Sequence, residues 1–487
     1  MTSAASSPMA QLQPEAVWHH FATLCRFPRA SKHEAPLRNH LRQWASQRSL
    51  ASEVDPAGNL LIRKPASAGC SASPGIVLQA HLDMICERNE GSRHDFSRDP
   101  IQPVLSDGWI KATDTTLGAD NGLGVALMLA LLEDTAAIHG PLEALFTVDE
   151  ESGMGGARGL TADLLRGRLM LNLDTEQWGE FYLGCAGGLD VNVSRDGMAE
   201  PLPAGWNAWR IELSGLRGGH SGIDIQEGRG NAIKLLVRVL RALEHSLPLR
   251  LGALRGGTAR NALPREATAV VALPLGISLD GSLALWQQRL TEELADTDPA
   301  VRLVARPDHC LELLCQKEQS LWLASLHAAP YGVKCMSRRL PGVVETSNNL
   351  GMVDIGPTAG NCNFMIRSLR DDDSEALAAE IASLFALSGT PVDISGRYPG
   401  WTPSPDSPLL ARCQQVFRHE FDSEARIMVI HAGLECGLFK SAYPEWDMVS
   451  FGPTIRGAHA PGEKVHILAV ERFWQLLVHV LEQIPAK

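Results

Sequence analysis

The chain has no long apolar run and no cluster of basic residues. Within its 487 residues, no stretch approaches the roughly 18 apolar residues of a membrane-spanning helix. Lys and Arg number 44 against 56 Asp and Glu, and no Lys/Arg run resembles a nucleic-acid face. The acidic run Asp371, Asp372 and Asp373 is most simply a solvated loop. We therefore expect no nucleic-acid partner and no membrane partner.

The chain also has few of the usual short catalytic or structural motifs. Its ten cysteines are scattered, with no Cys-x-x-Cys pair and no framework spacing, so we expect mostly buried free thiols. There is no Gly-x-x-x-x-Gly-Lys phosphate loop, and Ser221 lacks a Gly-x-Ser-x-Gly elbow. The first ten residues have neither a basic region nor an apolar core. These features predict a cytoplasmic protein.

What the sequence does contain is a set of histidines and carboxylates at predicted element ends. Short apolar runs at 75–80, 142–148, 168–173 and 446–451 are typical of buried strands, and 121–132 is typical of a buried helix. In open α/β sheets, reactive groups gather where such strands end. The residues that follow or precede these runs are His81, Asp83, Asp120, Asp149, Glu150, Glu151, Asp174 and His459.

Two imidazoles and several carboxylates at one sheet edge indicate a metal site, because these groups are ligands of zinc and related ions. One carboxylate can bridge two ions, and a pair about 3.5–4 Å apart lowers the pKa of the water between them. Glu150 is adjacent to the candidate ligand Glu151 but is not needed to hold metal, so it could take the proton of that water. For each motif alone a solvated surface residue is the better interpretation, but their conjunction favours the metal site.

Seven segments carry a resemblance to a known family. They are 79–87, 116–122, 147–154, 172–174, 218–222, 431–437 and 459–463. In these segments the chain resembles the aminoacyl-histidine dipeptidases, which belong to the dinuclear zinc exopeptidases together with tripeptidase T and glutamate carboxypeptidases. The similarity runs nearly end to end. The His-x-Asp and Asp-Glu-Glu motifs are typical of the whole group, whereas His-Ala-Gly-Leu-Glu-Cys-Gly at 431–437 points to the dipeptidase branch.

The resemblance implies a centre of two zinc ions, with cobalt or manganese as possible substitutes. It implies that one ion is held by His81, Asp120 and Asp174, and the other by Asp120, Glu151 and His459. Asp120 would then bridge the two ions. The family also has a cis peptide bond after the bridging aspartate, here between residues 120 and 121.

Further roles are implied by the same resemblance. Asp83 would orient the His81 ring, and Glu150 would be the general base for a metal-bridged hydroxide. His220, in a glycine-flanked turn, would stabilise the developing oxyanion in the active site of the partner subunit. The implied substrate-binding residues are Asn261, Arg367, Gly433 and Glu435.

The positions of these residues predict two domains built from three segments. Asp174 and His459 lie far apart in sequence but must meet, so the chain between them should leave the catalytic sheet and return. We expect an α/β catalytic domain with a mixed, largely parallel sheet flanked by helices, formed by residues 1–186 and 399–487. Residues 187–398 would form an inserted α+β lid, which in the family also forms a homodimer interface.

The sequence therefore predicts a metal-dependent dipeptidase that cleaves dipeptides with a C-terminal histidine, including β-alanyl-histidine. Two alternatives stay open at this point. One is a related metal-dependent amidase or deacylase of N-acyl amino acids. The other is a non-catalytic pseudoenzyme that binds peptides, against which the complete set of ligands, Asp83 and Glu150 argues.

Overall fold

A computed structural model describes residues 8–484, which form two compact units. The first unit contains the chain up to Gly184, then Pro403–Val429, and then the chain from Glu435 onward. The second contains Cys185–Thr402 and the short segment Ile430–Leu434. The predicted domain bounds of 1–186, 187–398 and 399–487 stay a proposal.

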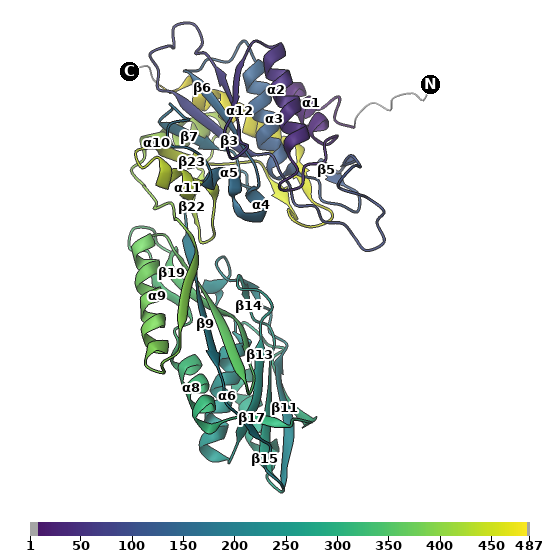
Figure 1. Cartoon of the computed structure of the whole chain (residues 1–487). Coiled ribbons are helices and arrows are strands. Elements are labelled where there is room, and N and C mark those ends of the chain that lie inside the picture. Colours follow the sequence, from purple (N-terminus) through teal and green to yellow (C-terminus); the bar gives the residue numbers. More distant parts are fainter. Residues whose placement is uncertain (1–7, 485–487) are drawn as a thin grey trace. The chain divides into compact units, whose positions relative to one another are not determined.

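The first unit is built on an eight-stranded mixed sheet with the strand order β1-β2-β6-β3-β7-β23-β8-β22. Figure 1 labels β3, β6, β7, β22 and β23 of this sheet. Its four central strands, β6, β3, β7 and β23, run parallel, while the pairs β1–β2, β2–β6 and β23–β8 are antiparallel. The strands are β1 Ala51–Val54, β2 Leu60–Lys64, β3 Ile76–His81, β6 Leu142–Thr147, β7 Leu169–Asn172, β8 Glu180–Cys185, β22 Arg426–Ile430 and β23 Asp447–Ser450.

The predicted fold class is confirmed, although parallel pairing is confined to the centre of the sheet. Every residue of β3 and β6 is buried, as expected for strands that are covered on both faces. A small second sheet with the order β24-β25-β5-β4 lies in the same unit. Its strands are β4 Pro103–Ser106, β5 Trp109–Ala112, β24 Ile455–Arg456 and β25 Lys464–His466.

Helices flank the main sheet of this unit. The central helix α3 is apolar on all sides, and nearly all of its residues are buried. It contacts both α1 and β3. Its second and third residues, Asp120 and Asn121, have non-helical dihedral angles and are joined by a cis peptide bond, as the resemblance implied. The helices are α1 Glu15–Leu24, α2 Ala35–Gln47, α3 Ala119–Glu133, α4 Glu150–Gly153, α5 Gly155–Arg158, α10 Pro408–Phe421, α11 Glu435–Ala442 and α12 Ile467–Glu482.

The second unit contains a long antiparallel sheet with the order β16-β11-β15-β13-β19-β20-β9-β21, and β18 pairs with β19. Its strands are β9 Gly187–Asp196, β11 Trp206–Ser214, β13 Arg250–Gly256, β15 Ala267–Pro274, β16 Arg302–Asp308, β18 Gly332–Met336, β19 Val344–Ile355, β20 Ala359–Ser368 and β21 Val392–Tyr398. Two short pairs complete it: β10 Ala199–Pro201 with β17 Glu312–Leu314, and β12 Gly219–His220 with β14 Ala262–Leu263.

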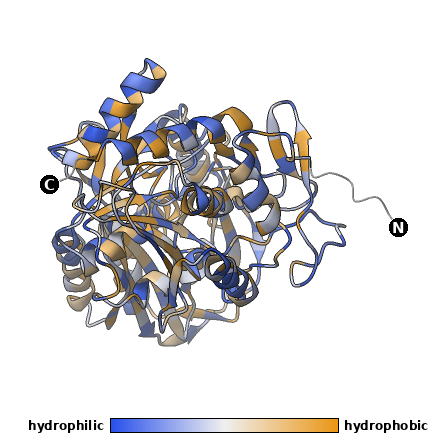
Figure 2. Ribbon diagram, turned by 90° about the horizontal axis from the view of Figure 1, so that it is seen from above, coloured by the Kyte–Doolittle hydropathy of each residue, from blue (hydrophilic) through white to orange (hydrophobic). Residues whose placement is uncertain are grey.

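Amphipathic helices pack on this sheet. The helices are α6 Ala232–Ser246, α7 Asp280–Glu293, α8 Gln316–Ala328 and α9 Asp371–Ala386, with a 3₁₀ turn at Ile225–Glu227. The apolar residues of α6, α8 and α9 share one core with the sheet, and the helices in Figure 2 carry both hydrophobic and hydrophilic residues. Within residues 8–484, no helix is both long and apolar enough to cross a membrane.

One expectation about local structure was wrong. Asp371, Asp372 and Asp373, expected in a solvated loop, form the first turn of α9. Acidic side chains are favourable there because the exposed N–H groups of a helix start carry partial positive charge. His81, expected at a strand end, is the last residue of β3, so that expectation is confirmed.

Candidate active site

The histidines and carboxylates predicted at element ends converge in the first unit. His81 ends β3, and Asp174 follows two residues after the end of the neighbouring parallel strand β7. Glu150 and Glu151 begin α4, directly after β6. Parallel strands deliver their carboxyl ends to one edge, which explains why residues so far apart in sequence meet.

Asp120 lies at the centre of this cluster. Its Oδ1 is 3.1 Å from Nε2 of His81, and its Oδ2 is 3.2 Å from Nε2 of His459. His81 is also 3.4 Å from Asp174, and His459 is 3.1 Å from Glu151. Asp120 therefore offers one oxygen to each of two groups of possible metal ligands. Each residue of a group contributes one possible ligand atom, and these atoms lie within 4.8 Å of one another. The two groups are His81, Asp120 and Asp174, and Asp120, Glu151 and His459.

Asp83 contacts both halves of this arrangement. Its Oδ1 is 3.4 Å from Nδ1 of His81, on the side of the ring that faces away from Asp120. Its carboxylate also accepts 3.1 Å hydrogen bonds from the backbone N–H groups of Glu150 and Glu151. Burial opposes its ionisation, but the bonds to His81 and Ser31 dominate and lower the pKa of Asp83 to about 2. Asp83 thus stays ionised while it fixes the positions of three neighbours.

The imidazoles of the cluster favour their charged form. Burial alone would lower the pKa of His81, yet Asp174, Asp120 and Asp83 outweigh it and raise that pKa well above the usual value. Hydrogen bonds to Asp120 and Glu151 raise the pKa of His459 to about 11. The carboxylates of the cluster therefore favour a positive charge beside them.

The donor set fits divalent metal ions. A metal ion can replace the imidazole protons, because neutral imidazole nitrogen and carboxylate oxygen are ligands that suit zinc and its neighbours. Oε1 of Glu151 is buried and has no hydrogen-bond partner, which is costly for a carboxylate oxygen unless a cation lies beside it.

Glu150 differs from the other carboxylates of the cluster. Burial, together with the negative charges of Asp174, Glu435 and Glu151, outweighs the positive charge of His81 and raises the pKa of Glu150 well above its usual value. Glu150 also forms a third possible ligand group with His81 and Glu151. The geometry therefore accommodates Glu150 either as a base or as a ligand, and its predicted role as base stays a prediction.

The second unit holds a separate cluster around Arg367. Arg367 is on β20, directly opposite Ser347 of β19, and its exposed fraction is only 4%. Its guanidinium donates a 2.7 Å hydrogen bond to the hydroxyl of Tyr398, whereas its buried Nε has no partner. The other amine nitrogen, Nη2, lies 3.4 Å from Nε2 of His220.

His220 is held as a neutral ring by its own turn. Its Nδ1 accepts hydrogen bonds from the backbone N–H groups of Gly222 and Ile223, so in the neutral ring the proton is on Nε2. Burial and the charge of Arg367 lower the pKa of His220 to about 4. Nε2 of His220 and Nη2 of Arg367 are then two donors facing each other. An oxygen acceptor between them would satisfy both.

His431 lies in the same cluster and was not among the residues predicted for the site. It opens the 431–437 motif, of which only Gly433 and Glu435 were predicted to contact substrate. Its Nε2 is 2.8 Å from the hydroxyl of Ser347, and burial together with Arg367 and His220 lowers its pKa to about 3. Its place at the head of a motif with family resemblance was the one signal that could have identified it.

The remaining predicted substrate residues lie in different surroundings. Asn261 is exposed, and its carbonyl accepts the N–H of Ser221, next to His220. Gly433 is half-buried in the segment Ile430–Leu434 of the second unit. Glu435 belongs to the first unit and is 1% exposed; its carboxylate accepts hydrogen bonds from Gln79 and Thr147. Burial raises the pKa of Glu435 to about 8.

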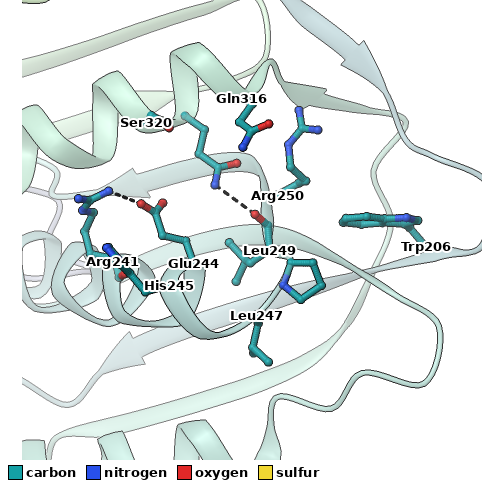
Figure 3. Close-up of a pocket in the computed structure, with 11 residues that line it drawn as sticks. Trp206, Arg241, Glu244, His245, Leu247, Leu249, Arg250, Gln316 and Ser320 are labelled. Atoms are coloured by element: carbon teal, nitrogen blue, oxygen red, sulfur yellow. Dashed lines mark hydrogen bonds and ion pairs between the residues drawn. The ribbon is translucent and has the colours of Figure 1, made fainter.

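A hollow of about 420 Å³ elsewhere in the second unit, at the end of α6 and the start of α8, is also polar (Figure 3). Its charged groups already have partners. Arg241 pairs with Glu244 (Figure 3). Arg250 pairs with Glu200, and the amide of Gln319 donates to the carbonyl of Leu249. We therefore assign no ligand to this hollow.

Comparison with known proteins identifies the class of enzyme. Residues 77–483 match the model of peptidase family M20/M25/M40. The chain is 43% identical to the cytosol non-specific dipeptidase of Escherichia coli (strain K12), over 99% of this chain and all of that protein. The crystal structure of aminoacylhistidine dipeptidase from Vibrio alginolyticus superposes with a TM-score of 0.92 at 43% identity and covers 99% of both chains.

The fold extends to more distant structures. A tripeptidase from Staphylococcus aureus has a TM-score of 0.56 at 14% identity, with 97% of this chain and 99% of that chain covered. The chain belongs to peptidase family M20/M25/M40 and is a peptide-bond hydrolase. The resemblance indicated by the sequence motifs is thereby confirmed.

Proposed function

We propose that this protein is a cytoplasmic metal-dependent dipeptidase that cleaves dipeptides with a C-terminal histidine, including β-alanyl-histidine. The observation that carries the proposal is the position of Asp120, which has one carboxylate oxygen beside each of two His/carboxylate groups. Two similar proteins are a cytosol non-specific dipeptidase and an aminoacylhistidine dipeptidase, which supports both the dipeptide substrate and the compartment.

The proposed metal centre uses the five ligands predicted from the sequence. His81, Asp120 and Asp174 would hold one ion, and Asp120, Glu151 and His459 the other. We propose zinc as the resident metal, with cobalt or manganese as substitutes, because the donors are nitrogen and oxygen. When bound, such ions polarise a carbonyl oxygen and lower the pKa of water.

Three further side chains have proposed roles in the reaction. Glu150 takes a proton from the attacking water and returns it to the leaving amine, a role for which a raised pKa is suitable near neutral pH. Asp83 keeps His81 oriented and holds the backbone of Glu150 and Glu151. Neutral His220 donates through Nε2 to the developing oxyanion.

Substrate recognition is assigned to the Arg367 cluster. A buried guanidinium with an unpartnered Nε is a fitting clamp for the free carboxylate of a dipeptide. We keep Asn261, Gly433 and Glu435 as proposed substrate-binding residues. The side chain of Glu435 is buried and accepts hydrogen bonds from Gln79 and Thr147, so its proposed contribution to substrate binding is indirect, through the groups around it.

We also propose a homodimer formed through the inserted domain, with His220 acting in the active site of the partner subunit. A closed two-fold dimer would supply a lid to each site reciprocally. Mixed dimers of His220→Ala and Glu150→Gln chains test this proposal, because one of their two sites has an intact base and an intact lid histidine. Recovery of activity supports action across subunits; no recovery in verified mixed dimers contradicts it.

A substrate panel tests the proposed reaction. Purified protein reconstituted with zinc should hydrolyse β-alanyl-histidine and alanyl-histidine, and should leave the C-terminal amide of the same dipeptide intact. A dipeptide without histidine measures the breadth of specificity, and an N-acetyl amino acid tests the deacylase alternative. Equal rates on acid and amide, or a preference for the N-acetyl compound, would exclude the proposed dipeptidase. No hydrolysis of any compound would favour the peptide-binding pseudoenzyme.

A further inference from the structure

Two buried side chains of opposite charge, Arg29 and Glu463, lie against the loop that precedes Asp120. Each is only 2% exposed. Their hydrogen-bond partners in this loop are main-chain groups rather than each other. Buried charges are costly unless they are paired or fully hydrogen bonded. These hydrogen bonds therefore have to offset the cost of burying both charges.

The carboxylate of Glu463 is saturated by backbone donors. Its Oε2 accepts from the N–H groups of Leu117 and Gly118 at 2.7 and 2.8 Å. Its Oε1 accepts from those of Ala119 and Asp120 at 2.7 and 3.2 Å. A carboxylate has about four acceptor positions, and all of them are used here on four consecutive residues.

The guanidinium of Arg29 bonds the same loop from its carbonyl side. It donates to the carbonyl oxygens of Leu82 and Asp83 at 2.9 Å and to that of Gly118. The N–H of Gly118 thus bonds the negative charge of Glu463, and its carbonyl bonds the positive charge of Arg29. Gly118 has φ +69°, and a Cβ at this position would lie 2.3 Å from Arg29, so only glycine allows this approach.

These bonds connect three chain segments that carry proposed metal ligands. Leu82 and Asp83 directly follow His81. The four N–H groups bound by Glu463 include that of Asp120 itself. Glu463 is four residues after His459 and is joined to that turn by a hydrogen bond from its N–H to the carbonyl of Ala460. Neither Arg29 nor Glu463 is placed to be a ligand of the proposed ions.

We propose that Arg29 and Glu463 are positioning residues that fix the spacing of His81, Asp120 and His459, and so set the affinity of the metal centre. This inference rests on the proposed function, because it presupposes that the cluster binds metal. Since Asp120 belongs to both ligand groups, displacement of its backbone should weaken both ions. Loss of an outer partner of metal ligands commonly costs about 10–100-fold in metal affinity.

A second arginine–glutamate pair in the same unit provides a matched control. Glu143, on β6, is 4% exposed and accepts from the N–H groups of Arg166 and Gly167 and from the side chain of Arg63. Glu143 is the second residue of β6, near the start of the strand. The proposed metal ligands lie beyond the other end of that strand. The control pair therefore anchors backbone without bonding any segment that bears a ligand.

The test compares Glu463→Gln and Arg29→Lys with Glu143→Gln and Arg63→Lys. Glutamine is close in shape to glutamate, but its amide nitrogen would face two N–H donors and could not accept from them. Each metal-free, full-length protein is titrated with Co²⁺ and followed by visible absorption, and its thermal unfolding is recorded without metal. We expect Co²⁺ binding to weaken about 10–100-fold in the first two variants and to change less than about twofold in the controls. This difference in affinity is expected even if all four variants unfold at similar temperatures.

The outcomes separate this proposal from the metal assignment. If Glu463→Gln or Arg29→Lys folds and binds Co²⁺ as tightly as the control variants, the positioning role is wrong. If neither folds, the pair is a structural anchor and the proposal is overturned. If the wild-type protein fails to bind Co²⁺, or Asp120→Ala binds it as well as wild type, the proposed metal centre itself is wrong.

Discussion

The two units contain clusters in which the same residue type is perturbed in opposite directions. In the first unit, neighbouring carboxylates raise the pKa values of His81 and His459. In the second unit, burial and a nearby arginine lower those of His220 and His431. A histidine by itself therefore does not identify a site. The charge of its neighbours distinguishes a cluster that attracts cations from one that attracts an anion or a carbonyl oxygen.

The difference follows from how each sheet supplies side chains. The parallel centre of the first unit delivers several acidic residues to one edge, since all four strands end there. The antiparallel sheet of the second unit instead places Arg367 and Ser347 opposite each other within adjacent strands.

Removing the shared carboxylate should abolish the cation cluster. We expect Asp120→Ala to lose both ions and to lower activity to background, because both of the ligand groups proposed for the two ions include an oxygen of Asp120. Elemental analysis of the purified variant and a dipeptide assay measure the two effects. Asp296→Ala, at an exposed position of the second unit, is the control. Full metal content in Asp120→Ala would contradict the two-ion assignment.

Glu150→Gln should separate chemistry from metal binding. We expect turnover to fall by roughly 10²–10⁴-fold, the usual contribution of a general base, while the metal content stays unchanged. Glu151→Gln provides the comparison, because it should lose metal as well as turnover. If Glu150→Gln loses metal instead, Glu150 is a ligand and the roles of the two neighbouring glutamates must be exchanged.

Arg367→Gln should weaken the anion cluster and leave the cation cluster intact. Deleting one partner of a buried charged pair costs about 2–5 kcal/mol, so kcat/KM for a free dipeptide should fall roughly 30-fold or more. The rate on the C-terminal amide should change little, and the metal content should not change. Arg370→Gln, at an exposed side chain three residues later, is the control. An undiminished preference for the free acid would remove Arg367 from substrate recognition.

The smallest expected effect is a shift in the titration of His220. Its pKa of about 4 lies below the ordinary value near 6.5, so the ring stays neutral at physiological pH. As pH falls from 6.5 towards 4, the unfolded chain takes up a proton that the folded state does not, and the free energy of unfolding should decrease. Arg367→Gln should raise the titration midpoint in an NMR experiment. An unchanged midpoint would show that burial alone sets it.

Much of the first cluster could be predicted because its signals are local. A run such as 75–80 predicts a buried strand, and the residue at its end is then placed at the sheet edge. The strands β3, β6, β7 and β23 lie within a residue or two of the predicted runs. The roles of Arg29 and Glu463 were not predicted. Arg29 lies in none of the segments that carry the resemblance, and Glu463 closes the segment 459–463 but gives no local sign that it packs against the loop at Leu117–Asp120.

Motif identity and the periodicity of buried strands are local properties of a chain, so the family, the mixed α/β fold and the residues that converge at the sheet edge could be inferred from the sequence. Which neighbours each ionisable group has depends on the folded chain. Burial and the surrounding charges set the protonation of His220 and His81 in opposite directions, and they left Arg367 with an unpartnered donor. These are distance-dependent interactions between segments far apart in sequence, and no local pattern encodes those distances.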